Sequence, residues 1–236
     1  MDKSFRHFLW AAALCSFLGA LTTILLIFLP SAEIGGFQHS ILLHDNSVYT
    51  SKLWILFLHP QFNFIASLGV AVVLLKKYPL EIIIGTFFLL VWTYTEMSQQ
   101  VLLIDALNQY WRPGYLSASD SMSRDIFLTL IKGTGAISDS QYFLLLYGFG
   151  LGTLLYGLAF IRENNWAKFI GIALVFIGVL SLCSFARYYL GLNELSEAVD
   201  WMYQWVYSFL QPLVRLAIAV WLIGSIRPLT LKESVR

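Results

Sequence analysis

The stretch FLWAAALCSFLGALTTILLIFL, residues 8–29, decides the class of fold. It carries no charged side chain, and an α-helix needs only about 20 apolar residues to cross the hydrocarbon core of a bilayer. Five more apolar stretches of comparable length follow it. The six predicted spans are 8–30, 53–75, 79–107, 141–161, 166–189 and 201–226. Because hydrocarbon cannot hydrogen-bond a bare backbone, only helices or a closed barrel can cross it. We therefore expect an all-α integral membrane protein, a bundle of six transmembrane helices that forms a single transmembrane domain over residues 1–236.

The composition agrees with membrane insertion. Hydrophobic residues make up 58% of the chain and charged residues 12%, whereas soluble domains carry about 25% charged residues. The net charge of +1 provides no global field that would attract nucleic acid, and there is no basic run with interleaved aromatic residues. The lipid bilayer is thus the expected partner, and nucleic-acid binding is not expected.

The first apolar stretch resembles a signal peptide at its start, because Lys3 and Arg6 precede it. It is, however, longer than the usual core of about 7–15 residues, and no A-x-A cleavage site follows it. We expect a retained first helix. The two cysteines, Cys15 and Cys183, fall inside predicted helices and form no CxxC pair, so we interpret them as small apolar filler rather than as a disulfide or metal pair.

The longest connection, 108–140, opens with the helix-breaking cluster Trp111-Arg112-Pro113-Gly114. Within it, the apolar residues of 123–132 recur at helical spacing. They are Ile126, Phe127, Leu130 and Ile131. This pattern predicts a short amphipathic helix that lies on the membrane surface or covers the bundle.

The Lys and Arg residues predict the orientation, because cytoplasmic loops carry an excess of them. With both ends of the chain on one side, nine of these residues fall on that side and five on the other. The larger set is Lys3, Arg6, Lys76, Lys77, Arg162, Lys168, Arg227, Lys232 and Arg236. The smaller set is Lys52, Arg112, Arg124, Lys132 and Arg187. We expect a multi-pass protein of the inner (plasma) membrane with cytoplasmic N- and C-termini.

Glycines predict where helices pack closely. The fourth predicted span holds Gly148, Gly150, Gly152 and Gly157, and the fifth holds Gly171 and Gly178. Small residues let neighbouring backbones approach in lipid, and Gly148 with Gly152 forms a small-xxx-small pair.

Polar side chains at membrane depth are the candidate functional residues, since each charged group costs about 2.5–3.5 kcal/mol to insert. They are Glu96, Gln99 and Gln100 in the third span, His59 and Asn63 in the second, and Gln211 and Arg215 in the sixth. Their spacing puts each set on one helix face. On the predicted topology all of them fall in the outer half of the membrane, so a single polar pocket open to the outside would collect them.

Three interpretations of these groups stay open. Glu96 and Arg215 could neutralise each other while the amides join helices by hydrogen bonds, or the same groups could line a ligand site in which Arg215 holds an anionic group. A proton relay or catalysis by Glu96 and His59 is a third reading. The sequence has no HExxH, GxSxG or Walker motif and offers no nucleophile, so we name no catalytic residue. His39, His44 and Asp45 match no tight metal motif, and we predict no metal site.

The second half of the chain resembles a known family. The resemblance rests on LLYGFGLG at 145–152, IGIAL at 170–174, SFAR at 184–187 and LAIAVWLI at 216–223. Over residues 141–227 the chain resembles an uncharacterised bacterial family of polytopic membrane proteins, a domain of unknown function. The resemblance implies a bacterial inner-membrane bundle and supplies no activity. The family carries a carboxylate in its last helix near the place of Arg215, where this chain departs from it.

From these observations we expect a polytopic inner-membrane protein that binds a small or lipid-like ligand in an outward-facing intramembrane pocket and is not an enzyme. The alternative is a non-catalytic accessory or scaffold subunit that binds a membrane-protein partner. A small transporter or intramembrane enzyme comes third. The sequence indicates no cofactor.

Overall fold

The computed structural model describes residues 3–29, 36–163 and 166–231, with only the backbone described over 227–231. These residues are almost entirely helical and contain no strand. Six helical segments are long and apolar enough to cross a membrane. The prediction of an all-α membrane bundle of six helices is therefore confirmed.

The spanning segments are longer than their apolar cores. They are α1 (Lys3–Phe28), α3 (Ser47–Leu74), α4 (Pro79–Val101), α6 (Ser121–Ile161), α7 (Ala167–Tyr189) and α9 (Ser208–Leu231). Shorter helices extend or connect them: α2 (Phe37–Leu42), η1 (Leu43–Asp45), η2 (Leu102–Trp111), α5 (Arg112–Ser117), η3 (Asn193–Leu195), α8 (Ser196–Met202) and η4 (Tyr203–Tyr207). The predicted end of the first span, residue 30, lies outside the described residues.

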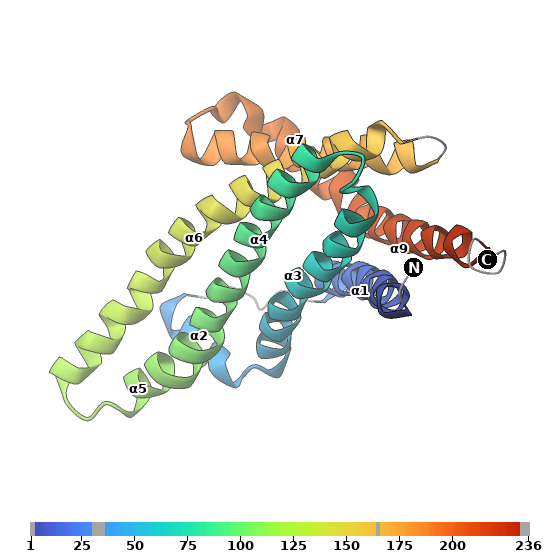
Figure 1. Ribbon diagram of the computed structural model, residues 1–236. Coiled ribbons are helices and arrows are strands. Elements are labelled where there is room, and N and C mark those ends of the chain that lie inside the picture. The colour runs from blue at the N-terminus through green and yellow to red at the C-terminus, as the bar shows by residue number, and fades with distance from the viewer. Residues whose placement is uncertain (1–2, 30–35, 164–165, 232–236) are drawn as a thin grey trace.

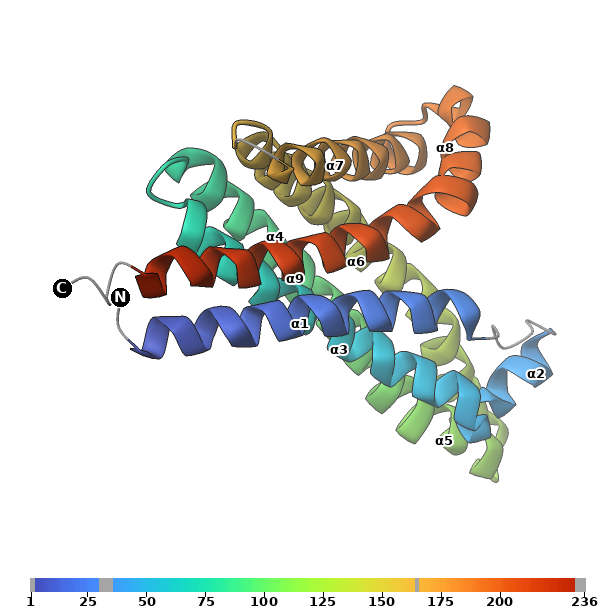
Figure 2. The ribbon, with the colours of Figure 1, turned by 90° about the vertical axis from the view of Figure 1, so that its right-hand side faces the viewer.

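Two helix triplets make up the bundle. In one, α1 packs against both α3 and α9, and in the other, α6 packs against both α4 and α7. Contacts of α3 with α4 and of α7 with α9 join the triplets. Figure 1 shows α4 beside α6, and Figure 2 shows α1 between α9 and α3. In Figure 2, α1 begins and α9 ends at the same end of the bundle, which we name the terminal end; the opposite end is the distal end.

Glycines allow the α4–α6–α7 triplet to pack backbone against backbone. A Cβ on Gly171 would lie 2.5 Å from the backbone nitrogen of Ile161, and one on Gly178 would lie 2.7 Å from the backbone nitrogen of Leu154. On the other face of α6, a Cβ on Gly148 would lie 2.9 Å from the carbonyl oxygen of Phe88. Because helices gain little from hydrophobic burial in lipid, such close backbone contact is what holds them together. The predicted packing role of these glycines is confirmed.

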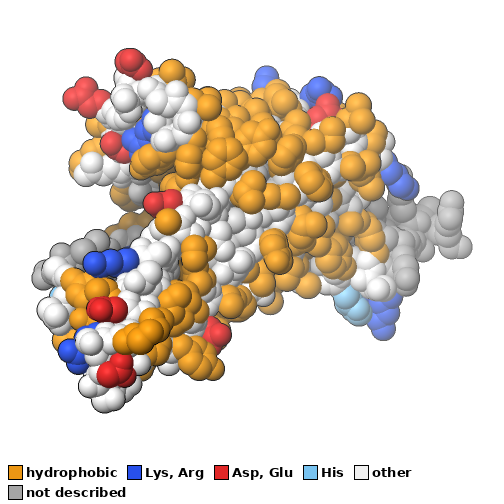
Figure 3. Space-filling model, turned by 90° about the vertical axis from the view of Figure 1, so that its left-hand side faces the viewer, with side chains coloured by type: hydrophobic (Ala, Val, Ile, Leu, Met, Phe, Trp, Pro, Cys, Tyr) orange, Lys and Arg blue, Asp and Glu red, His pale blue; other side chains and the backbone are white. Residues whose placement is uncertain are grey.

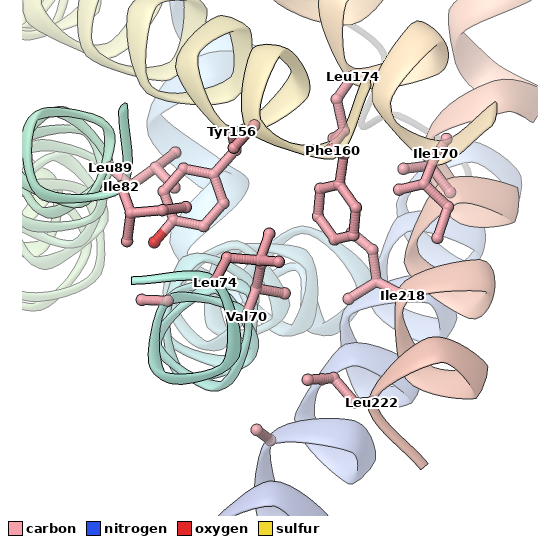
Figure 4. Close-up of a cluster of buried hydrophobic side chains, with 14 of the residues drawn as sticks. Val70, Leu74, Ile82, Leu89, Tyr156, Phe160, Ile170, Leu174, Ile218 and Leu222 are labelled. Atoms are coloured by element: carbon pink, nitrogen blue, oxygen red, sulfur yellow. The ribbon is translucent and has the colours of Figure 1, made fainter. Parts of the chain in front are cut away.

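The apolar core fills the terminal half of the bundle. Figure 4 shows side chains of this core, with Phe160 and Tyr156 of α6 between those of α3, α4, α7 and α9. The Phe160 ring contacts the Trp221 ring of α9 edge-on at 4.9 Å between centroids. The Tyr156 hydroxyl donates to the carbonyl of Ser67 in α3 at 3.2 Å. The two triplets are thus closed against each other in this half, which leaves the distal half for a site.

Charged side chains gather at the two ends of the molecule, and hydrophobic side chains cover the middle (Figure 3). At the terminal end, two ion pairs join the turn after α3 and the start of α4 to the end of α6: Lys77 with Glu163 at 2.8 Å, and Arg162 with Glu81 at 2.5 Å. The hydrogen bond from Lys77 to Glu163 raises the pKa of Lys77 above its usual range. This distribution is the one expected of a protein whose middle lies in hydrocarbon.

The structure corrects the predicted connection 108–140. The third span continues as a helix through Ser117, and α6 begins at Ser121, so only residues 118–120 are not helical. The predicted amphipathic segment 123–132 is helical, but it is the first part of α6 rather than a separate helix. Pro113 does not end the helix: it lies in the first turn of α5, directly after the π-helical segment Leu102–Trp111.

Two capping side chains explain other helix starts. The Asn46 side chain accepts hydrogen bonds from the backbone N–H groups of Val48 and Tyr49, both at 3.0 Å, so α3 begins at Ser47 rather than at residue 53. The Asp120 side chain caps α6 by accepting from the N–H of Ser123 at 2.8 Å. Both are polar N-cap residues of the kind that fix a helix start.

Candidate functional site

A cavity of about 190 Å³ lies between the helices in the distal half of the bundle. Each of the six spanning segments contributes to its wall, from Leu26 near the end of α1 to Ser181 in the distal half of α7. The described lining residues are Leu26, Leu56, His59, Trp92, Glu96, Tyr142, Leu145, Leu146, Phe149, Ser181, Tyr203, Tyr207 and Gln211. We call this space the main cavity.

Glu96 supplies the acidic group of the main cavity. It lies on the buried face of α4, and its side chain is 8% exposed. The carboxyl interacts with the Trp92 side chain, one helical turn earlier, and electrostatically with Arg215. In the part of the chain that the structure describes, no ion pair within 4.0 Å joins Glu96 to Arg215. Glu96 and Arg215 therefore interact through space and not as a direct ion pair.

His59 is fixed by hydrogen bonds on both ring nitrogens. The Asn63 amide donates to Nε2 at 2.8 Å, so Nδ1 carries the proton and donates to the Thr22 hydroxyl, also at 2.8 Å. Thr22 in turn donates to the carbonyl of Gly19 at 3.0 Å. Both nitrogens are occupied, and the imidazole is a neutral wall residue rather than a metal ligand.

Gly19 is what allows Asn63 to reach this position. A Cβ on Gly19 would lie 2.2 Å from the Asn63 amide oxygen. That oxygen finds no hydrogen-bond donor among the described residues, although the side chain is almost fully buried. Asn63 is part of the wall of a second, smaller cavity.

The second cavity, of about 30 Å³, shares the wall residue Trp92 with the main cavity. Arg215 and Asn63 contribute to its wall, together with the hydroxyl-bearing residues Ser67, Thr153 and Tyr156. Its volume is about that of one water molecule in the liquid. We call it the Arg215 cavity.

Sequence analysis missed the aromatic side of the main cavity. The rings of Tyr203 and Tyr207 contact each other in a tilted arrangement, 4.8 Å between centroids, and Tyr142 of α6 also lines the cavity. The segment Tyr203–Tyr207 is a π-helix, and the Ser208 hydroxyl donates to the carbonyl of Tyr203, five residues earlier. In the sequence, two tyrosines four residues apart near a helix end do not differ from ordinary interfacial anchors.

The predicted site residues divide into three groups. The main cavity collects Glu96, His59 and Gln211, and the Arg215 cavity collects Asn63 and Arg215. Gln99 and Gln100 line neither. The Gln99 amide instead donates to the carbonyl of Ser138 in α6 at 3.0 Å, because α4 and α6 pack closely at this level. Gln100 is buried, and its Oε1 has no partner in the described part of the chain.

No group of three or more His, Cys, Asp or Glu side chains in the described residues could hold a metal ion. His44 has its Nδ1 against the carbonyl of Ile41 at 2.8 Å and its Nε2 3.4 Å from Asp45. The polar and aromatic wall of the main cavity consists of one carboxylate, neutral polar groups and aromatic rings.

Comparison of this chain with known protein families, with curated proteins and with solved structures finds no match. The site has to be interpreted from its own geometry.

Proposed function

We propose that this protein is a multi-pass inner-membrane protein that binds a small polar molecule in the main cavity and does no chemistry on it. The observation that carries the proposal is the convergence of all six spanning segments on one cavity whose wall includes a buried carboxylate, a buried amide and a fixed imidazole. Ionisable groups in the membrane interior are costly and mark binding or transport paths.

The size of the main cavity favours a small ligand over a lipid-like one. Pockets for drug-sized molecules usually measure about 300–1,000 Å³, and the main cavity measures about 190 Å³. A small metabolite with a few polar atoms suits this volume, whereas an acyl chain does not.

The position of the cavity supports access from outside the cell. It lies in the half of the bundle away from the end where α1 begins and α9 ends. The excess of Lys and Arg on the terminal side favours a cytoplasmic location for that end. A ligand would then enter from the opposite face.

The test is native mass spectrometry of the protein released from its own membrane in a mild detergent. We expect a small molecule to co-purify at one copy per chain. Leu56→Trp should abolish it, because Leu56 lines the main cavity. The matched control is Leu58→Trp, two residues along the same helix, where the side chain is exposed and outside the cavity wall.

Equal ligand occupancy in the Leu56→Trp and Leu58→Trp variants would contradict the proposal, since the bound molecule would then lie elsewhere. A protein that carries no small molecule and retains a second polypeptide would favour the alternative of an accessory subunit.

A further inference from the structure

The wall of the main cavity has the charge pattern of a cation site. Glu96 is its one carboxylate, and the described lining residues include no Lys or Arg. The polar remainder, His59, Ser181 and Gln211, is neutral. His59 adds no positive charge, because its Nε2 accepts a hydrogen bond from the Asn63 amide and therefore carries no proton.

Aromatic rings make up much of the rest of the wall. Five of them line the cavity: Trp92, Tyr142, Phe149, Tyr203 and Tyr207. They come from three different segments, α4, α6 and η4. The faces of aromatic rings carry negative electrostatic potential and attract organic ammonium groups, which are hydrated too weakly to resist transfer from water.

Glu96 lacks a cation in direct contact. No basic side chain in the described residues lies within 4.0 Å of its carboxylate, although buried charges are normally paired. Arg215 lies in the wall of the other cavity, and its charge acts through space on Glu96, His59 and Tyr207. A cation in the main cavity would therefore contact Glu96, which lines it, and would not contact Arg215, which does not.

We infer that the ligand of the main cavity is a small organic cation, an amine or quaternary ammonium compound, held by the Glu96 carboxylate and the surrounding aromatic rings. This inference rests on the proposed function and names the ligand class of the same site. An anion would meet the Glu96 carboxylate in this cavity, so the charge pattern disfavours it.

The experiment compares probes of one shape and different charge. Purified full-length protein in a maltoside detergent is titrated with choline, with its uncharged isostere 3,3-dimethylbutan-1-ol, and with acetate. Phosphocholine detergents are avoided because they carry the probe's own headgroup. Binding is measured by isothermal titration calorimetry and by the shift in thermal unfolding temperature. We expect choline to bind about tenfold or more tightly than the uncharged isostere, and acetate not to bind.

Variants identify the groups responsible. Glu96→Gln should remove the preference for choline over the isostere. The control, Asp105→Asn, changes an exposed carboxylate further along the same helical segment and should keep the preference. If Glu96→Gln gives too little folded protein, Tyr203→Leu serves as the second variant. It should weaken choline binding and leave binding of the isostere unchanged.

A second measurement needs no probe. Because the Glu96 carboxylate has no cation in contact, Glu96→Gln should raise the unfolding temperature of the ligand-free protein, whereas loss of a direct ion pair would lower it.

The outcomes separate this inference from the proposed function. Equal binding of choline and its isostere, or an unchanged preference in Glu96→Gln, would overturn the cation assignment. The absence of choline binding would overturn it too. In each case the proposed function stands or falls on whether Leu56→Trp loses the co-purifying molecule.

Discussion

Thr22 shows how one hydroxyl can fix a site in a membrane protein. Its hydroxyl accepts a hydrogen bond from His59 Nδ1 at 2.8 Å and donates one to the backbone of its own helix. It thus joins α1 to α3 and gives the buried N–H of the imidazole an acceptor. In hydrocarbon, loss of such a hydroxyl leaves the imidazole N–H without an acceptor, which is more costly than loss of the contact itself.

We predict that Thr22→Val, which keeps the shape and removes the hydroxyl, lowers the free energy of unfolding by about 1–2 kcal/mol. Thermal unfolding in detergent, followed by circular dichroism, measures the change. Thr129→Val is the control, because the Thr129 hydroxyl is exposed and bonds only to its own helix. An effect of Thr22→Val no larger than that of the control would show that the His59 proton finds another acceptor.

The identity of the polar residues was the part of the site that the sequence predicted best. Glu96, His59 and Gln211 stood out in the sequence because charged and amide groups are rare at membrane depth, and the structure places all three in one cavity. Gln99 was grouped with them by helical spacing alone. Spacing gives the face of a helix but not its neighbour, and at this level the neighbour is α6 rather than a cavity.

At the scale of the element, α6 illustrates what hydropathy does and does not reveal. It has 41 residues, and at 1.5 Å per residue it is roughly 60 Å long, about twice the thickness of the hydrocarbon core. The apolar signal located only its second half. The first half was predicted as part of a loop that contains a short helix, because polar residues and the Pro113-Gly114 pair suggested that the third span ends there. In the structure, the π-helical segment Leu102–Trp111 and α5 continue the helix through this pair.

Glycines of the α6–α7 contact lead to a paired prediction. Gly171→Ala should destabilise the protein by about 1–3 kcal/mol, because the added Cβ would lie 2.5 Å from the backbone nitrogen of Ile161. Gly135→Ala should stabilise it by about 0.5–1 kcal/mol, since Gly135 lies within helix α6 and no side chain or neighbouring helix lies within 4 Å of its missing Cβ. Unfolding of both variants in one detergent tests the pair. Equal effects would mean that helix propensity, and not backbone contact, governs these positions.

At the scale of the whole molecule, the two triplets meet differently in the two halves of the bundle. In the terminal half, Phe160 and Tyr156 fill the space between them. In the distal half, the main cavity takes that place. The sequence predicted the six spans but not the difference between a packed half and a half with a cavity. That difference depends on which helices pair. In lipid, small residues and hydrogen bonds decide helix pairing, and several arrangements of the six helices could satisfy them.

Orientation is a property of the whole molecule that labelling can measure. In a background in which Cys15 and Cys183 are replaced by serine, we predict that Ser119→Cys, at the exposed distal end, reacts with a membrane-impermeant maleimide on intact cells. Lys76→Cys, exposed at the terminal end, should react only after the membrane is permeabilised. The reverse pattern would place the cavity on the cytoplasmic side and contradict the proposed direction of ligand entry.

The pairing of α1 with α9 has a consequence for biogenesis. The Ser16 hydroxyl of α1 donates to the carbonyl of Arg215 in α9 at 2.7 Å, across 199 positions of the chain. The ribosome delivers α1 before α9. Until α9 is released, the face of α1 that it will cover remains in contact with lipid, and Gln211 and the tyrosines of η4 are missing from the cavity wall. Insertion of the first spans therefore cannot complete the pocket, which closes only when translation of the final helix ends.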